Sequence, residues 1–172
     1  PEVMAALGSH LKLAEILGKM VAQLIKGRVR DVQIEFAGTF PRDPEPITIA
    51  ATKGFLEPFL DEAPNYINAL AIAKERDVRV SRVFASRSRG YTSHVEVRAI
   101  SDEDVVFVGG TVFENDPRIV NIGDFYIEIK PEGTMLICSN YDKPGAIGKI
   151  GTVLGNSGVN ISSMQLSRVS GD

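Results

Sequence analysis

The chain has 172 residues, of which 44% are hydrophobic and 24% charged, and its formal net charge is −3. This composition is typical of a folded globular protein and excludes a disordered chain, which needs lower hydrophobicity or a larger charge imbalance. The acidic balance and the short basic runs exclude nucleic acid and a membrane as expected partners. The single cysteine, Cys138, lies in the apolar run "TMLICSN", where we expect it to be buried, and fits a cytoplasmic location.

The first third of the chain predicts helices and one clear strand. In "GSHLKLAEILGKMVAQLIKG" the apolar residues recur at helical spacing, which predicts an amphipathic helix with Ser9 as N-cap and Gly27 as its stop. The run "DVQIEFAG" alternates, as in a half-buried strand over residues 31–38. After a proline cluster, "ITIA" at 47–50 predicts a short strand that passes into a helix.

The middle of the chain predicts one more helix and then a series of strands. The segment "APNYINALAIAKERD" predicts a helix that starts near Pro64 and buries Ile67, Leu70 and Ala71. From Val78 onward five runs of period two predict an antiparallel meander, and its Gly123-Asp124 link suits a primed hairpin turn. The polar stretch "KPEG", residues 130–133, is the expected linker.

The segment after the linker predicts a β-α-β unit. A strand begins at Met135 and Ile137, a helix carries an apolar stripe from Ile147 to Leu154, and a second strand covers residues 159–168. The expected fold class is therefore α+β: helices on a mostly antiparallel sheet, followed by the β-α-β half of a small domain.

The glycines of this last segment do not match a nucleotide-binding loop. Gly145, Gly148 and Gly151 read G-x-x-G-x-x-G, whereas a dinucleotide fingerprint needs G-x-G-x-x-G and a Walker loop needs G-x-x-x-x-G-K-[ST]. A phosphate cradle is therefore disfavoured.

The stretch "DKPG" offers a different kind of anion site. Pro144 suits the first helical position, and Gly145 permits close approach to unpaired amides at the helix start, which favour an anion such as the carboxylate of an amino acid. Asp142 would accept the ammonium group, and Asn160 would add an amide. The same residues also suit a plain helix start and turn without a ligand, and their spacing alone leaves both interpretations open.

The run "YDKPGAIGKIGTVLGNSGVNISSMQLSR" resembles the start of an ACT domain, specifically that of long-form D-3-phosphoglycerate dehydrogenases. The blocks "LAEILGKMVAQL", "KGFLEP", "YINALAIAKERDV" and "NIGDFYIEI" are similar to the intervening, allosteric substrate-binding domain of these enzymes. The resemblance implies an intervening domain over 1–130 and a partial, β-α-β half of an ACT domain over 131–172. It also implies that the chain is a fragment, whose NAD-binding and catalytic parts precede Pro1, so that no cofactor or catalytic residue is expected here.

The resemblance further implies a regulatory ligand. In this family L-serine, or another small amino acid, binds between paired ACT domains of a homo-oligomer and inhibits the NAD-dependent oxidation of 3-phosphoglycerate to 3-phosphohydroxypyruvate in serine biosynthesis. Position 140 often carries His or Tyr in relatives, where this chain has Asn. Carried over by position, the effector contacts are Asn140, Asp142, Pro144, Gly145, Asn160 and Ile161.

A second set of residues could bind a phosphorylated hydroxy acid in the first domain. Guanidinium groups match phosphate oxygens in a bidentate way, although charges at turns and strand ends also occur simply as solvated groups. The two histidines, His10 and His94, have no further ligand at metal-binding spacing, so no metal is expected. The candidate anion-binding residues are Lys53, Arg87, Arg89 and Arg118.

Two other functions remain as alternatives. The first is the β-region of a bacterial L-serine dehydratase, which pairs a similar domain with an ACT module, although its serine-rich glycine and histidine signature does not occur around "GSHLKLAE". The second is a free-standing regulator that binds an amino acid and has no catalytic partner.

Overall fold

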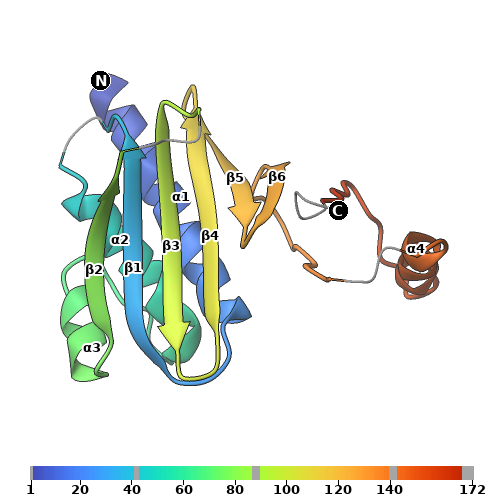
Figure 1. Cartoon of the computed structure of the whole chain (residues 1–172), viewed down its shortest axis with the longest axis horizontal. Helices are drawn as coiled ribbons and strands as arrows, with labels where there is room; N and C mark the ends of the chain where they lie inside the picture. The colour runs from blue at the N-terminus through green and yellow to red at the C-terminus, as the bar shows by residue number, and fades with distance from the viewer. Residues whose placement is uncertain (1, 41–42, 87–89, 140–142, 168–172) are drawn as a thin grey trace. The chain divides into compact units, whose positions relative to one another are not determined.

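The computed structural model describes residues 2–40, 43–86, 90–139 and 143–167, with residues 2–6 as backbone only (Figure 1). The chain forms two compact units. The first consists of the residues up to Pro131 together with Ser167, and the second runs from Glu132 to Leu166.

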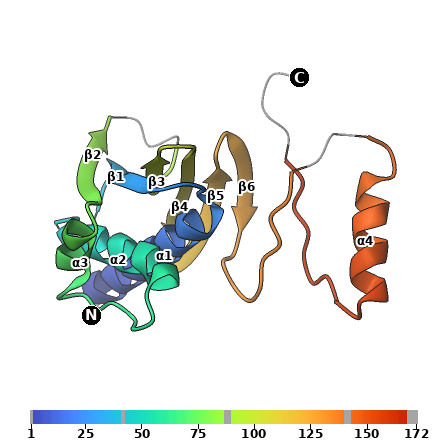
Figure 2. The ribbon, with the colours of Figure 1, turned by 90° about the horizontal axis from the view of Figure 1, so that it is seen from below.

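The first unit is a layer of helices on one face of a six-stranded sheet of order β2-β1-β3-β4-β5-β6. Figure 2 shows that the helices of this unit all lie on the same side of the sheet, so the other face is open. The expected α+β class is confirmed. The strands are β1 Val29–Gly38, β2 Arg79–Ala85, β3 Ser93–Ser101, β4 Val105–Phe113, β5 Asp116–Ile122 and β6 Phe125–Ile129. The helices are α1 Glu2–Leu24, α2 Glu45–Leu56 and α3 Ala69–Glu75, with a 3₁₀ turn at Glu57–Phe59.

Helix α1 confirms the first predicted helix but starts earlier. It begins at Glu2, because residues before Ser9 are also good helix formers. Ser9 is therefore not the N-cap; its hydroxyl donates instead to the carbonyl of Asn115, at 2.8 Å. The predicted stop is confirmed, since Gly27 follows the helix with a φ of 76°.

The strand predicted for residues 47–50 is wrong, because this segment is part of α2. Pro46 lies in the first turn of the helix, where a missing N–H costs nothing. The hydroxyls of Thr48 and Thr52 donate to the carbonyls of Pro44 and Thr48, at 3.2 and 2.8 Å. Burial of the apolar face of α2 against α1 outweighs the strand preference of its β-branched residues.

Two glycines let α1 and α2 pack with their backbones in close contact. A Cβ atom at Gly54 would lie 1.9 Å from the carbonyl oxygen of Glu15, and one at Gly18 would lie 2.1 Å from that of Ala51. Neither position has room for a side chain. The two helices therefore form one layer over the sheet, and the side chains of Leu13 and Leu17 of α1 are fully buried.

The face predicted for the third helix is also wrong. Ile67 is 94% exposed, Leu70 and Ala71 are exposed too, and the helix buries Ala69 and Ala73 instead. The cause is a local turn before the helix. The side-chain oxygen of Asn65 accepts from the amides of Ile67 and Asn68, at 2.8 and 3.0 Å, and this delays the helix start to Ala69.

The meander is confirmed for β3 to β6, but β2 differs from the prediction. It pairs with β1 in parallel, from Asp31↔Arg79 to Ala37↔Ala85. The reason is that α2 and α3 return the chain to the end of the sheet where β1 began, so β1 and β2 run in the same direction. The predicted Gly123-Asp124 turn is confirmed, since it joins β5 to β6 at the pair Ile122↔Phe125.

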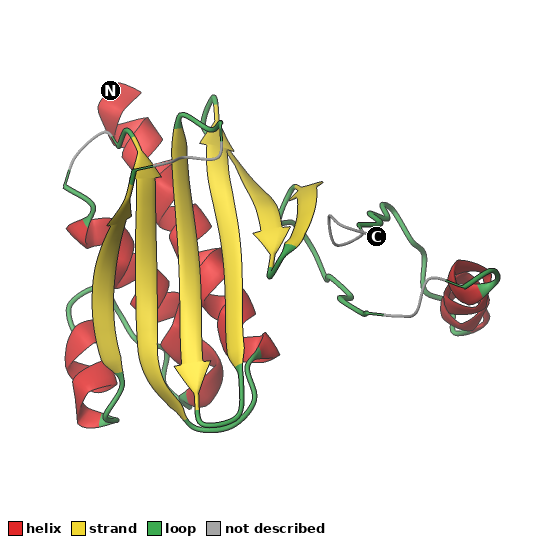
Figure 3. Cartoon of the chain, viewed as in Figure 1, coloured by secondary structure: helices red, strands yellow, loops and turns green. Residues whose placement is uncertain are grey.

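In the second unit the described residues form one helix, α4, which spans Ala146–Asn156. The strands predicted from Met135 and over residues 159–168 do not form among residues 132–139 and 143–166, which Figure 3 draws as a helix and loops. A β-ladder needs a partner strand, and the described part of this unit offers none to either segment. Cys138 is accordingly exposed rather than buried.

The close packing of α1 against α2 makes a prediction about stability. Gly54→Ala should lower the free energy of unfolding by about 3 kcal/mol, because the new methyl group overlaps the backbone of α1. Gly8→Ala, in α1 but with no neighbouring atom within 4 Å of its Cβ, should raise it by about 1 kcal/mol. Urea unfolding measures both, and equal effects of the two substitutions would contradict the tight helix contact.

Candidate functional site

The first candidate site is the N-terminus of α4. Gly145 precedes the helix with a φ of 88°, in the left-handed region that favours glycine. The prediction that Pro144 occupies the first helical position is wrong, because Pro144 lies in the turn before the helix and the amide of Ala146 donates back to the carbonyl of Lys143, at 3.2 Å. This turn brings the chain into α4 without a side-chain cap at Gly145.

The amides at the start of α4 are suited to an anion. The amide of Lys149 donates to the carbonyl of Gly145 at 3.0 Å, as the first bond of the helix ladder. No backbone carbonyl in the described part of the chain accepts from the amides of Ile147 and Gly148. Unpaired amides at a helix N-terminus carry partial positive charge, which favours a carboxylate.

The other predicted effector contacts lie elsewhere or outside the described residues. Asn140 and Asp142 belong to the segment 140–142, which is outside them. Asn160 and Ile161 are exposed and follow the turn at Gly158 that ends α4. Among the residues that the structure describes, no backbone hydrogen bond joins these two residues to the turn before the helix.

The second candidate site is the open face of the sheet. On β3 the residues Val95 and Val97 point into the core, so the alternating residues His94, Glu96 and Arg98 lie on the face without helices. His94 and Glu96 are nevertheless only 2% exposed. Burial of a carboxylate on an uncovered face requires close polar partners.

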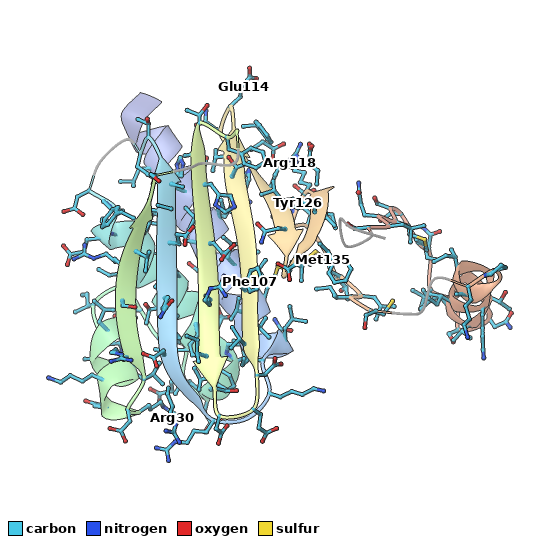
Figure 4. The ribbon with its side chains drawn as sticks, in the orientation of Figure 1. Arg30, Phe107, Glu114, Arg118, Tyr126 and Met135 are labelled. Atoms are coloured by element: carbon cyan, nitrogen blue, oxygen red, sulfur yellow. The ribbon has the colours of Figure 1, made fainter. Side chains whose placement is uncertain are left out.

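A chain of polar contacts supplies these partners. Nε2 of His94 lies 3.3 Å from Oδ1 of Asn121, and Nδ2 of Asn121 donates to Glu96 at 3.3 Å. Arg98 donates to the other oxygen of Glu96 at 2.9 Å, and its guanidinium lies 4.1 Å from the ring centroid of Phe107. Phe107 is labelled in Figure 4, which looks onto this face.

A glycine makes room for this network. A Cβ atom at Gly109 of β4, which pairs with Asn121 of β5, would lie 2.1 Å from Oδ1 of that residue and 2.7 Å from Nε2 of His94. The network therefore depends on the absence of a side chain at this position.

The polar network was not predicted from the sequence. The alternation in "SHVEVRAI" contains part of the signal, since it places His94, Glu96 and Arg98 on the same face of one strand. Asn121 lies on another strand, and only the register of β4 with β5 brings it to the same place.

The structure does not bring the candidate anion-binding residues Lys53 and Arg118 together. Lys53 belongs to α2, in the helix layer, where it forms an ion pair with Glu15. The hydroxyl of Tyr66 donates to the same carboxylate at 3.1 Å, and burial together with Glu15 raises the pKa of Tyr66. Arg118 belongs to β5, where it pairs with Thr111 of β4, and it lies on the face of the sheet opposite to the helix layer (Figure 4). Arg87 and Arg89 lie outside the described residues.

Arg118 has an acidic partner on the same strand. Its Nη1 lies 2.6 Å from Asp116, and Lys130 lies 3.6 Å from the other oxygen of that carboxylate. The hydrogen bond from Arg118, more than the charge of Lys130, lowers the pKa of Asp116. An anionic ligand at Arg118 would have to compete with this carboxylate.

Two other kinds of function find no support in the described residues. No group of three or more His, Cys, Asp or Glu side chains is placed there to hold a metal ion. None of the helices among these residues is both long and apolar enough to cross a bilayer.

Comparison with known proteins identifies the family. The family model of the D-3-phosphoglycerate dehydrogenase intervening domain matches residues 6–123, and that of the ACT domain matches residues 134–171. The D-3-phosphoglycerate dehydrogenase of Synechocystis sp. is 38% identical over 171 residues, which cover 98% of this chain and 31% of that protein. The D-3-phosphoglycerate dehydrogenases of Methanocaldococcus jannaschii and Bacillus subtilis are each 33% identical to this chain. The matched regions cover 97% and 95% of the chain, respectively, and 32% of each relative.

The chain thus spans about a third of the length of these relatives. The resemblance inferred from the sequence is confirmed, since the intervening-domain model alone matches well over half of the chain. The chain belongs to the family of the D-3-phosphoglycerate dehydrogenase intervening domain, and an ACT segment follows that domain.

Proposed function

We propose that this chain is the regulatory region of a D-3-phosphoglycerate dehydrogenase and that it binds L-serine, or another small amino acid, at the start of α4. The whole protein then oxidises 3-phosphoglycerate to 3-phosphohydroxypyruvate with NAD, in the cytoplasm, at the entry to serine biosynthesis. The match of nearly the whole chain to one third of several such dehydrogenases supports this proposal. The two alternatives, a serine dehydratase region and a free-standing regulator, gain no support from these relatives.

The left-handed turn at Gly145 is the main structural support for an amino-acid ligand at this position. Gly145 directly precedes the N-terminus of α4 and has no side chain that could obstruct a ligand there. The amides of Ile147 and Gly148 can donate to a carboxylate at this position. The carboxylate of Asp142 accepts from the ammonium group of the amino acid. Asn140, Asn160 and Ile161 complete the proposed pocket.

Control of a distant reaction requires more than binding. A ligand shifts an equilibrium between two arrangements only by the difference between its affinities for them, and such couplings amount to about 1–3 kcal/mol. We therefore propose that the protein is a homo-oligomer in which the amino acid binds one arrangement of subunits more tightly than another.

The substitution Asp142→Ala tests the amino-acid site. It should weaken binding of L-serine to the full chain by about tenfold or more, because the ammonium group loses its charged acceptor. Isothermal titration calorimetry gives the affinity. Asp124→Ala, which removes the same charge from the exposed β5–β6 turn, is the control and should leave the affinity unchanged. Equal affinity of Asp142→Ala and the unmodified chain would contradict the site.

We also propose that Arg118, with Arg87 and Arg89 of the β2–β3 connection, binds a phosphorylated hydroxy acid on the open face. Two ring contacts support this location: Tyr91, at the end of that connection, stacks on His94 and packs against Phe113, with ring centroids 6.0 and 6.1 Å apart. Phe113 and Arg118 lie on the paired strands β4 and β5. Lys53 takes no part, because it belongs to α2, in the helix layer on the other face of the sheet.

Arg118→Gln tests this second site. It should weaken binding of 3-phosphoglycerate by about tenfold, because one charge-assisted contact to the phosphate is lost. Arg79→Gln is a matched control, since Arg79 is also an arginine of the sheet in an ion pair with an aspartate, Asp31, but lies on β2 at the edge of the sheet. An equal loss of affinity in both variants would reduce the effect to general electrostatics and would contradict a site at Arg118.

A further inference from the structure

The strand β2 has one free edge. It is the terminal strand of the sheet, and within the described residues its one strand partner is β1. No other described residue forms a backbone hydrogen bond with this strand, so the backbone groups along its outer edge are available to another strand. Exposed edges of this kind are usually protected by short length, proline, a β-bulge or charged side chains, especially lysine, because they otherwise pair with other chains.

Apart from two arginines, β2 has none of these protections. The strand has seven residues, contains neither proline nor lysine, and keeps an unbroken register with β1. Its two arginines are already paired within the chain: Arg79 with Asp31, and Arg82 with Asp43 at 3.8 Å. The opposite edge strand, β6, has only five residues and a register shift against β5.

Two apolar side chains of β2 are exposed beside this edge. Val83 is 39% exposed and Phe84 is 68% exposed, and as neighbours in a strand they point to opposite faces. The ring of Phe84 stacks on that of Phe36 at a centroid distance of 5.7 Å, which holds it in place. The edge therefore presents fixed apolar contacts on both faces of the sheet.

We propose that β2 pairs antiparallel with β2 of a second copy of this chain, about a two-fold axis at Val83. In an antiparallel pair, residues directly opposite each other point to the same face, so the two-fold axis must pass through a residue position. An axis at Val83 places this valine opposite its own copy. It also places Arg82 opposite Phe84, and Ser81 opposite Ala85, twice each by symmetry.

The side chains favour this register and a copy of the same chain as the partner. The guanidinium of Arg82 meets the ring of Phe84 from the other copy, which is an attractive cation–π arrangement that the symmetry repeats. An axis one residue earlier, at Arg82, would place two guanidinium groups directly opposite each other, which is unfavourable. Pairing at Val83 joins two six-stranded sheets into one continuous sheet and closes the free edge. This inference uses the first unit alone and does not depend on the amino-acid ligand.

Disulfide trapping tests the pairing directly. In a Cys138→Ser background, which removes the exposed native thiol, Val83→Cys should give a covalent dimer of the full chain under mild oxidation. The two Cβ atoms at the axis would lie about 4.5–5.5 Å apart, close to the separation that a disulfide spans. Val105→Cys is the control, since Val105 is 49% exposed but belongs to β4, inside the sheet. No more dimer from Val83→Cys than from Val105→Cys would overturn the proposal.

A second measurement needs no cysteine. Sedimentation velocity of the full chain should show self-association, and Val83→Lys should raise its dissociation constant by about tenfold or more, because two ammonium groups would face each other across the axis. Val105→Lys should leave the constant unchanged. Far-ultraviolet circular dichroism confirms that both variants are folded. Association as tight in Val83→Lys as in the unmodified chain would count against pairing through β2, whether or not the chain binds serine.

Discussion

The close contact between α1 and α2 determines which face of the sheet in the first unit carries the apolar core and which face is left for polar side chains. Gly18 and Gly54 let the two helices approach until backbone meets backbone, and the resulting layer covers one face of the sheet. The other face then has no helix of this unit over it, which leaves it free to carry polar side chains. The buried Glu96 can form its contacts with Asn121 and Arg98 on this face because the apolar core lies on the other one.

The two proposed sites bind anions by different physical means. At the start of α4 the donors are backbone amides, whose position follows from the turn at Gly145 and which cannot lose their partial charge with pH. On the open face the donor is the guanidinium of Arg118, which is already engaged with Asp116 and must exchange this partner for a ligand. A small zwitterion suits the first arrangement, and a doubly charged phosphate suits the second.

Periodicity predicted much of this fold from the sequence, and its failures have physical causes. It identified α1, β1 and the meander of β3 to β6, because each has a clear polar and apolar face. It failed at residues 47–50, where burial against α1 outweighs local preference, and at β2, whose partner depends on the path of two helices. Of the candidate sites, the glycine turn before α4 was visible in "DKPG", although Pro144 lies outside the helix. The network around Glu96 was not visible in the sequence, because only the register of the paired strands brings Asn121 close to Glu96.

Above all, we propose that the amides at the start of α4 receive the carboxylate of an amino acid. Nitrogen-15 nuclear magnetic resonance of the chain, titrated with L-serine, tests it most directly because each amide reports on its own hydrogen bond. We expect the largest saturable shifts at the amides of Ile147 and Gly148. Saturation of the chain by L-serine with these two amides unchanged, or no response anywhere in the chain, would show that the start of α4 does not bind the amino acid.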